Sequence, residues 1–282
     1  MEKPLILLMT MLPLLAGACR SMGSQAEHDT ESGEPVPVVK EDSAHWESRV
    51  SVRADLPVRS MDIFVYNPDG LKDLAFHVRA EGATATVSLP DSLPKTVAVV
   101  ANARGTFNTE ALKHFDSLGA LVFRYSDDSP DAPLMSGMGA LVPGSDTAVV
   151  LTPLLCTVVV QEITNYYDGD RIAENPRVWL ENVNGEAEVF RNQGFAVKDP
   201  SRTRAVYLPC DIGLYSQYPD IRLYCYPNDL PDPNPGNPAT TLVMQYEIEG
   251  ETQTLSLALH PLLRGETIPV QLGLRPYGAG RP

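Results

Sequence analysis

The sequence has few of the residues that carry catalysis or bind metals. It contains only five histidines and four cysteines in 282 residues, and these form neither an HExxH motif nor a CxxC pair. Ser136, in Met135-Ser136-Gly137, lacks the leading glycine of a nucleophile elbow. The surrounding glycines do not make a dinucleotide fingerprint or a P-loop. The sequence therefore predicts a protein that is not an enzyme and has no cofactor.

Positive charge is also scarce, because 22 lysines and arginines stand against 36 aspartates and glutamates, which leaves a net charge of -14. A chain this acidic is repelled by phosphate backbones, so nucleic acid is excluded as a partner. Aromatic residues make up only 7% of the chain. The acidic segments at 127–131 and 168–170 lack EF-hand spacing and are predicted to be solvated loops rather than calcium sites.

Long helices and membrane-spanning segments are not expected. The 25 prolines exceed the average usage of about 5% and favour many turns. The apolar segment from Leu5 to Leu15 is shorter than the roughly 20 residues that a spanning helix needs. It follows Lys3 and ends in the small residues Ala16-Gly17-Ala18, which is the pattern of a cleaved export signal.

The segment Leu14-Leu15-Ala16-Gly17-Ala18-Cys19 resembles the lipobox of bacterial lipoproteins, although Ala16 stands where Leu is usual. The resemblance implies that residues 1–18 are removed and that Cys19 carries a diacylglycerol, which holds the chain to a lipid bilayer. The alternative is an ordinary secretory signal followed by a chance cysteine. Residues 19–45 are rich in Ser, Gly, Glu, Asp and Pro, so they are predicted to form a flexible acidic tether.

Three cysteines follow Cys19, at positions 156, 210 and 225. An exported protein can form one disulfide from them, and the sequence does not choose the pair. Burial as small hydrophobic residues is the alternative for Cys156 and Cys225, which lie in apolar runs.

Alternating apolar residues predict a β-sandwich over residues 46–145. Val50, Val52, Ala54, Leu56 and Val58 would lie on one face of its first strand. The largely apolar run at 95–101 predicts a central strand, and Leu112 and Phe115 share a face of one short helix at 109–118. The other strands of this sandwich are predicted at 61–66, 74–80 and 85–89.

Residues 146–282 are predicted to form a second β-sandwich. Thr147 to Ile163 is the longest β-prone run, and Pro153 divides it into two strands. Turns at Asn184-Gly185 and Glu249-Gly250, with short strands between them, have the spacing of a sandwich. These strands are predicted at 177–180, 187–190, 205–208, 221–226, 240–248, 252–259 and 267–274.

Several blocks, in this order, resemble the Bacteroidetes fimbrillin superfamily of FimA-like fimbrial subunits and FimB-type anchors. The blocks are 60–70, 96–102, 133–137, 151–163, 223–228, 241–243, 262–265 and 268–270. Leu155 stands where an Arg is common in that family. The resemblance covers about residues 50–275 and implies an all-β protein made of two transthyretin-like β-sandwiches in series.

The resemblance also implies a non-enzymatic cell-surface subunit, displayed on the outer membrane, that assembles with other fimbrial subunits by strand exchange. A protease cuts after an arginine, the first strand leaves, and a strand from a neighbour fills the groove. The candidate cleavage sites are Arg49 and Arg59, and the candidate strand is marked by Val50, Val52, Leu56 and Val58.

An anchor has to keep its first strand, because the cut would also remove the lipid on Cys19. The residues after Leu274 contain two prolines and do not alternate, which makes them a poor donor strand. The sequence thus favours a lipid-anchored or accessory subunit that attaches or caps a fimbria. The alternative is a glycan-binding surface lipoprotein of a nutrient-uptake system, for which the two tryptophans, Trp46 and Trp179, are a poor supply of stacking surfaces. A host or bacterial surface receptor is a further candidate partner.

Overall fold

The computed structural model describes residues 45–230, 236–259 and 261–276. The signal segment, Cys19, almost all of the predicted tether and the last six residues lie outside this part of the chain. Strands hold 51% of the described residues and helices 4%, so the predicted all-β class is confirmed. None of the described helices is long and apolar enough to cross a membrane. The described residues all belong to one compact unit.

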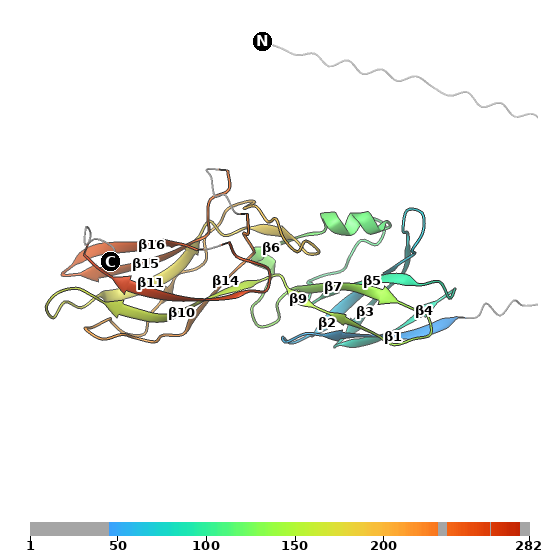
Figure 1. Cartoon of the computed structure of the whole chain (residues 1–282), viewed down its shortest axis with the longest axis horizontal. Helices are drawn as coiled ribbons and strands as arrows, with labels where there is room; N and C mark the ends of the chain where they lie inside the picture. Colours follow the sequence, from blue (N-terminus) through green and yellow to red (C-terminus); the bar gives the residue numbers. More distant parts are fainter. Residues whose placement is uncertain (1–44, 231–235, 260, 277–282) are drawn as a thin grey trace, which may run out of the picture. The chain divides into compact units, whose positions relative to one another are not determined.

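Two sheets are built from the N-terminal strands (Figure 1). In the first, β1 (Trp46–Arg53) lies between β4 (Thr84–Leu89) and β8 (Thr147–Val150). The second has the order β3-β2-β5-β7-β9, with β5 at its centre as predicted. Its strands are β3 (Leu74–Glu81), β2 (Ser60–Tyr66), β5 (Lys95–Ala101), β7 (Met135–Leu141) and β9 (Thr152–Pro153). Val50, Ile63 and Val99 lie in the buried core that these two sheets share.

Two further sheets are built from the C-terminal strands. One has the order β14-β10-β17, in which β10 pairs antiparallel with β14 and parallel with β17. The other has the order β13-β11-β15-β16. The strands are β10 (Cys156–Asn165), β11 (Glu174–Glu181), β13 (Val206–Tyr207), β14 (Ile221–Cys225), β15 (Thr241–Ile248), β16 (Glu251–Ala258) and β17 (Thr267–Leu274). Val158, Leu180 and Met244 belong to their common core.

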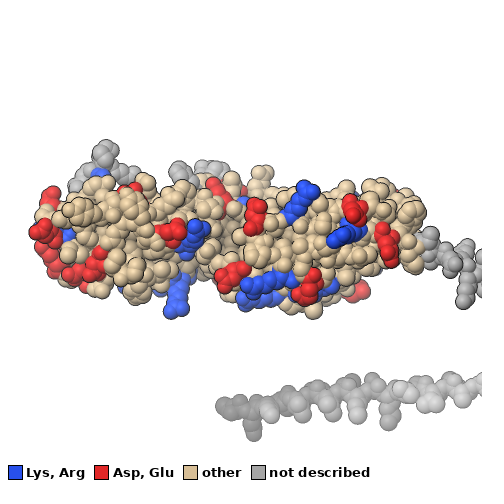
Figure 2. Space-filling view, turned by 90° about the horizontal axis from the view of Figure 1, so that it is seen from below, with Lys and Arg blue, Asp and Glu red and all other residues tan. Residues whose placement is uncertain are grey.

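A small ribbon of two strands and a separate core connect the two groups of strands. β6 (Val122–Arg124) pairs antiparallel with β12 (Glu186–Glu188). A third cluster of buried residues draws Phe64 and Ala98 from the N-terminal strands and Val189, Phe195 and Tyr226 from the C-terminal part of the chain. Charged side chains on the face shown in Figure 2 are separated by wide areas of uncharged residues.

The first strand is displaced from its predicted position. It begins at Trp46 and ends at Arg53, whereas the alternation predicted a strand from Val50 to Val58. Pro57 has no N–H to donate to a neighbouring strand, and the chain bends at Asp55 and Leu56 before β2 begins. Leu56 is 39% exposed, so its predicted place in the core was wrong.

The predicted helix at 109–118 was also wrong. Turns occupy residues 109–112, and a 3₁₀ helix, η1 (Phe115–Ala120), follows. The backbone explains the difference, because Lys113 O accepts from Leu74 N and Phe115 N donates to Lys72 O. Those groups are committed to the neighbourhood of β3 and cannot form an α-helical ladder. Leu112 is nevertheless buried, as the pattern required.

The N-terminal sheets continue beyond residue 145, where the sequence placed the boundary. β8 pairs with β1, and β9 pairs with β7. The run from Thr147 to Ile163 therefore contains three strands rather than two, because β8 and β9 belong to different sheets. The chain leaves the N-terminal group at Leu154-Leu155 and enters β10 at Cys156.

Candidate functional site

The first strand fills a groove between two other strands of its own chain. β1 pairs antiparallel with β4, where Val50 faces Ala85, and parallel with β8, where Val50 faces Thr147. Backbone groups on both sides of β1 are therefore used in pairing, as in a central strand. Removing β1 would expose the edges of both neighbours at once.

The side chains of β1 fix its register in this groove. Val50 is fully buried, and Val52 packs partly buried against the same core. The Oγ atom of Ser48 accepts a hydrogen bond from Gly144 N at 2.9 Å. Of the predicted strand residues, Val50 and Val52 lie in β1, whereas Leu56 and Val58 follow it. Val58 still packs against the core from outside the strand.

Both candidate processing sites have exposed side chains. Arg49 lies in the middle of β1, opposite Thr86, so a protease could reach its backbone only after the strand had left the sheet. Arg59 lies in the connection before β2. Its N–H donates to Asn102 Oδ1 at 2.8 Å, and its carbonyl accepts from Gly82 N at 2.9 Å. Cleavage at Arg59 requires only that these two hydrogen bonds open. Unlike cleavage at Arg49, it does not require β1 to leave the sheet first.

A close approach between β7 and β8 holds one wall of the groove. A Cβ atom added at Gly137 would lie 2.1 Å from Val150 O, whereas one added at Gly139 would lie 3.6 Å from Val149 Cγ2. Only glycine at position 137 therefore permits β8 to lie at this distance from β7. Met135-Ser136-Gly137, which lacks the pattern of a nucleophile elbow, thus has a role in packing.

Arg264 joins the two groups of strands through its guanidinium. It lies in the turn before β17 and donates to Thr152 O at 2.7 Å and to Val189 O at 2.7 Å, with Ser136 Oγ at 2.8 Å. Longer bonds reach Pro153 O at 3.4 Å and Arg191 O at 3.1 Å. Burial lowers the pKa of Arg264 to about 10, so the group stays charged at neutral pH.

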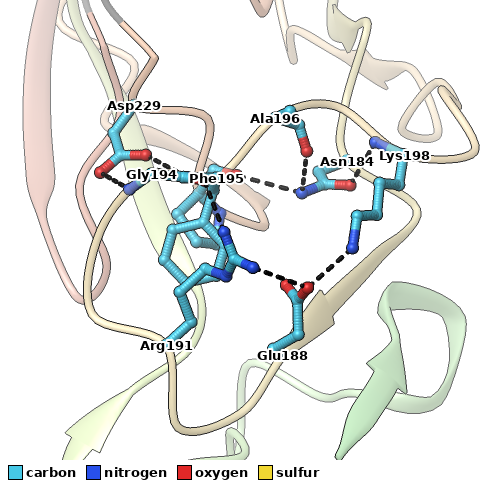
Figure 3. Close-up of polar contacts among 9 residues, drawn as sticks. Asn184, Glu188, Arg191, Gly194, Phe195, Ala196, Lys198 and Asp229 are labelled. Carbon is cyan, nitrogen blue, oxygen red and sulfur yellow. Dashed lines mark hydrogen bonds and ion pairs between the residues drawn. The ribbon is translucent and has the colours of Figure 1, made fainter. Parts of the chain in front are cut away.

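The loop after β12 is held by a second set of polar contacts (Figure 3). Glu188 lies 3.1 Å from Arg191 Nη2 and 2.7 Å from Lys198 Nζ. Burial acts to raise the pKa of Glu188, but the hydrogen bond from Lys198 and the nearby positive charges outweigh it, and the pKa is lowered. Asp229 accepts from Gly194 N at 3.0 Å and from Phe195 N, which holds Phe195 in the connecting core.

The carboxylate of Asp62 is held by partners on a neighbouring strand. Asp62 Oδ1 lies 3.1 Å from His77 Nε2, and burial raises the pKa of Asp62 against the effects of His77 and Arg79. No group of three or more His, Cys, Asp or Glu side chains that could hold a metal ion occurs among the described residues.

Asp128 departs from the solvated loop that the sequence predicted. It lines a cavity of about 480 Å³, and its Oδ1 accepts from Ser129 N at 2.7 Å and Leu134 N at 2.8 Å. Burial raises the pKa of this carboxyl. The carboxylate therefore holds the chain ahead of β7 in place.

No pattern in the sequence indicated a role for Arg264 or Glu188. The only signal for Arg264 was its place in the block 262–265, which contributed to the family resemblance. The partners of Arg264 lie between 73 and 128 positions away in the chain, so no local pattern could have identified them. Glu188 and Lys198 are ten positions apart, which is not a spacing that a strand or turn brings together.

Comparison with known proteins identifies the fold. No protein-family model matches the chain, and no curated protein matches it. A candidate cell adhesion protein from Parabacteroides distasonis has a TM-score of 0.62 at 10% identity and covers 82% of this chain and 89% of its own. A fimbrial assembly protein from the same species has a TM-score of 0.52 at 11% identity, covering 81% of this chain and 91% of its own.

A fimbrilin from Porphyromonas gingivalis is also similar, with a TM-score of 0.57 at 10% identity and coverage of 76% of this chain and 80% of its own. At such identities the likeness concerns the fold. The chain therefore has the fold of Bacteroidetes fimbrilins and cell adhesion proteins, and the resemblance seen in the sequence blocks is confirmed at that level.

Proposed function

We propose that this chain is a non-enzymatic cell-surface fimbrial subunit of the anchor or accessory type. It is tied to the outer membrane through an acylated Cys19, and it keeps β1 in its own groove while other subunits add to it. The proposal is carried by the pairing of β1 with both β4 and β8. The fold shared with fimbrial proteins supports it.

The junction between the strand groups supports a role in an assembly that bears load. Arg264 ties the turn before β17 to β7 and β9 through Ser136, Thr152 and Pro153. A guanidinium with several acceptors in a buried site resists separation of its partners, because each freed carbonyl would lose its hydrogen bond. Such a connection suits a subunit that passes tension from a membrane to a fimbria.

The alternative of a glycan-binding lipoprotein loses support at Trp179. The residue is only 8% exposed, and the guanidiniums of Arg177 and Arg202 lie 6.0 Å and 5.8 Å from the centroid of its ring. The face that a sugar would stack on is therefore covered.

Mass spectrometry of the native surface protein tests the proposal. We expect an acylated N-terminus at Cys19 that is continuous with β1 and residues 54–59. A mature N-terminus at Ser60 would mean that Arg59 is cleaved, and the chain would then be a stalk or tip subunit.

Deletion of residues 46–53 provides a second test. The shortened chain is expected to be unstable alone and to be rescued by an added peptide with the β1 sequence. A peptide in which Val50 is replaced by Asp is the matched control, since it would place a charge in the buried core and should not rescue. Equal rescue by both peptides would contradict a specific groove.

A further inference from the structure

The structure brings together two of the three cysteines that follow Cys19. Cys156 and Cys225 are register partners on the antiparallel strands β10 and β14. Directly opposed residues in such a pair have Cα atoms about 4.5 Å or 5.5 Å apart, depending on the hydrogen-bond pattern. Both values fall in the range of about 4.4–6.8 Å found for disulfides. The register therefore places the two backbones at a bridging distance.

The side chains of the two cysteines also share an environment. Both are fully buried and belong to the core of the C-terminal sheets. The Cys156 thiol donates to Leu263 O at 2.9 Å. Cys210 is exposed and contacts Gln217 at 3.5 Å, so it lies in a different setting. Of the three cysteines, only Cys156 and Cys225 face each other in a strand pair.

We propose that Cys156 and Cys225 form a disulfide as the chain folds outside the cytoplasm. The inference rests on the proposed function, because disulfides persist in exported proteins and are rare in the cytoplasm. The bond forms by exchange with a disulfide-bearing oxidant. The two thiols lose two protons and two electrons, the Sγ–Sγ bond forms, and the oxidant's disulfide is reduced to two thiols.

The timing of this step follows from burial. The attacking species in disulfide exchange is a thiolate, and the hydrogen bond with Cys225 together with burial raises the pKa of the Cys156 thiol. Exchange is therefore fast while the strands are still exposed and slow once the core has closed. The same burial protects the finished bond from reductants, so it acts as a permanent cross-link rather than a switch.

The position of the bond gives it a mechanical role. Cys156 directly follows Leu154-Leu155, where the chain passes from the N-terminal strands into β10. Cys225 directly precedes Tyr226, a member of the connecting core. Tension on the chain therefore reaches the C-terminal sheets at Cys156, and a bond to Cys225 keeps β10 from being pulled away from β14.

Peptide mapping of the full chain from the membrane fraction tests the pairing. Free thiols are trapped by acid and alkylated before digestion, so that no new disulfide forms. Each cysteine, including Cys19, is then identified by the peptide that contains it. We expect the Cys156 and Cys225 peptides to be linked and Cys210 to be alkylated. An exported protein with all three cysteines alkylated would overturn the disulfide and leave the fimbrial role intact.

A cytoplasmic location of the mature chain would instead contradict the proposed function. The pairing is then decided with the purified, reduced full chain, refolded in mixtures of oxidised and reduced glutathione. Formation of the Cys156–Cys225 bond in these mixtures supports the geometry, and pairing that involves Cys210 as often as the other two overturns it.

Thermal unfolding and force measurements test whether the bond stabilises the chain and limits its extension. A loop of about 70 residues predicts that reduction lowers the Tm of the wild type by roughly 10 °C. The Cys156→Ala/Cys225→Ala double variant should not respond to reductant, and Cys210→Ala should respond like the wild type.

Pulled from its ends, the oxidised chain should extend roughly 230 Å less than the reduced chain. Equal extension in both states would overturn the proposal.

Discussion

The Nη2 atom of Arg264 lies 2.8 Å from the Oγ atom of Ser136. Ser136 in turn donates from Oγ to Val189 O at 2.6 Å. These two bonds connect β7, the turn before β17 and the loop after β12, which are far apart in sequence. A guanidinium suits this place because its five N–H donors lie in one plane and can serve several carbonyls together.

Replacement of Arg264 by Met should destabilise the protein by about 3–5 kcal/mol, because several buried carbonyls lose their donor. Arg264→Lys should cost less, since an ammonium restores part of the bonding but cannot match the planar fork. Urea unfolding measures both values. The control is Arg222→Met, which breaks an exposed pair with Asp220 and should change stability by less than about 1 kcal/mol. Equal losses at both positions would contradict the role of Arg264.

Gly137→Ala should destabilise the N-terminal sheets, whereas Gly139→Ala should be tolerated. The added methyl group at position 137 would collide with the backbone of Val150, which cannot move without shifting β8. We expect a loss of about 1–3 kcal/mol from overpacking and faster proteolysis near β1. Limited trypsin digestion compares the two variants. Similar cleavage rates would show that β8 has room to move.

Glu188 should make the stability of the chain depend on pH. Its pKa is lowered in the folded state, so the unfolded chain binds its proton more readily. The contribution of Glu188 is therefore fully present above the unfolded value of about 4.5 and is lost as the pH falls through the folded value. Glu188→Gln should cost about 1–3 kcal/mol at pH 7, and this difference should shrink in acid.

Denaturant unfolding at a series of pH values measures this difference. The control is Glu249→Gln, because Glu249 forms an exposed pair with Arg171 and its loss should matter little at any pH. A constant difference between wild type and Glu188→Gln from pH 7 to pH 3 would rule out the ionic role of Glu188.

Replacement of Cys19 by Ala should release the chain from the membrane or block its maturation. The small residues before Cys19 place this cysteine at the predicted cleavage point. Membrane fractionation and labelling with a fatty-acid analogue measure the effect. Cys210→Ala is the matched control, since it also removes one cysteine from the same chain. Unchanged labelling of the Cys19→Ala variant would show that the lipobox assignment is wrong.

The sequence predicted the strands well where their apolar residues alternate or follow one another without a break. The run at 95–101 is the clearest case, because its five neighbouring apolar residues can only be buried on both faces of a central strand. Its prediction needed no knowledge of distant residues.

The sequence-based predictions were wrong where hydrogen bonds to distant parts of the chain decide the local structure. Lys113 and Phe115 hydrogen bond to residues near β3, and this overrides the helical pattern at 109–118. β8 lies after the predicted boundary but pairs with β1, about 100 positions earlier in the chain. The hydrogen bond between Arg264 and Ser136 and the pairing of Cys156 with Cys225 likewise depend on which strands become neighbours, which local sequence does not determine.

The mixed pairing of β1 has a consequence for the direction in which a strand can bind between β4 and β8. On the β4 side the groove requires the alternating hydrogen-bond spacing of antiparallel strands, and on the β8 side it requires the even, slanted spacing of parallel strands. A strand that entered in the reverse direction would meet the wrong spacing on both sides. A groove of this kind would therefore admit β1, or a peptide with the β1 sequence, in one direction only.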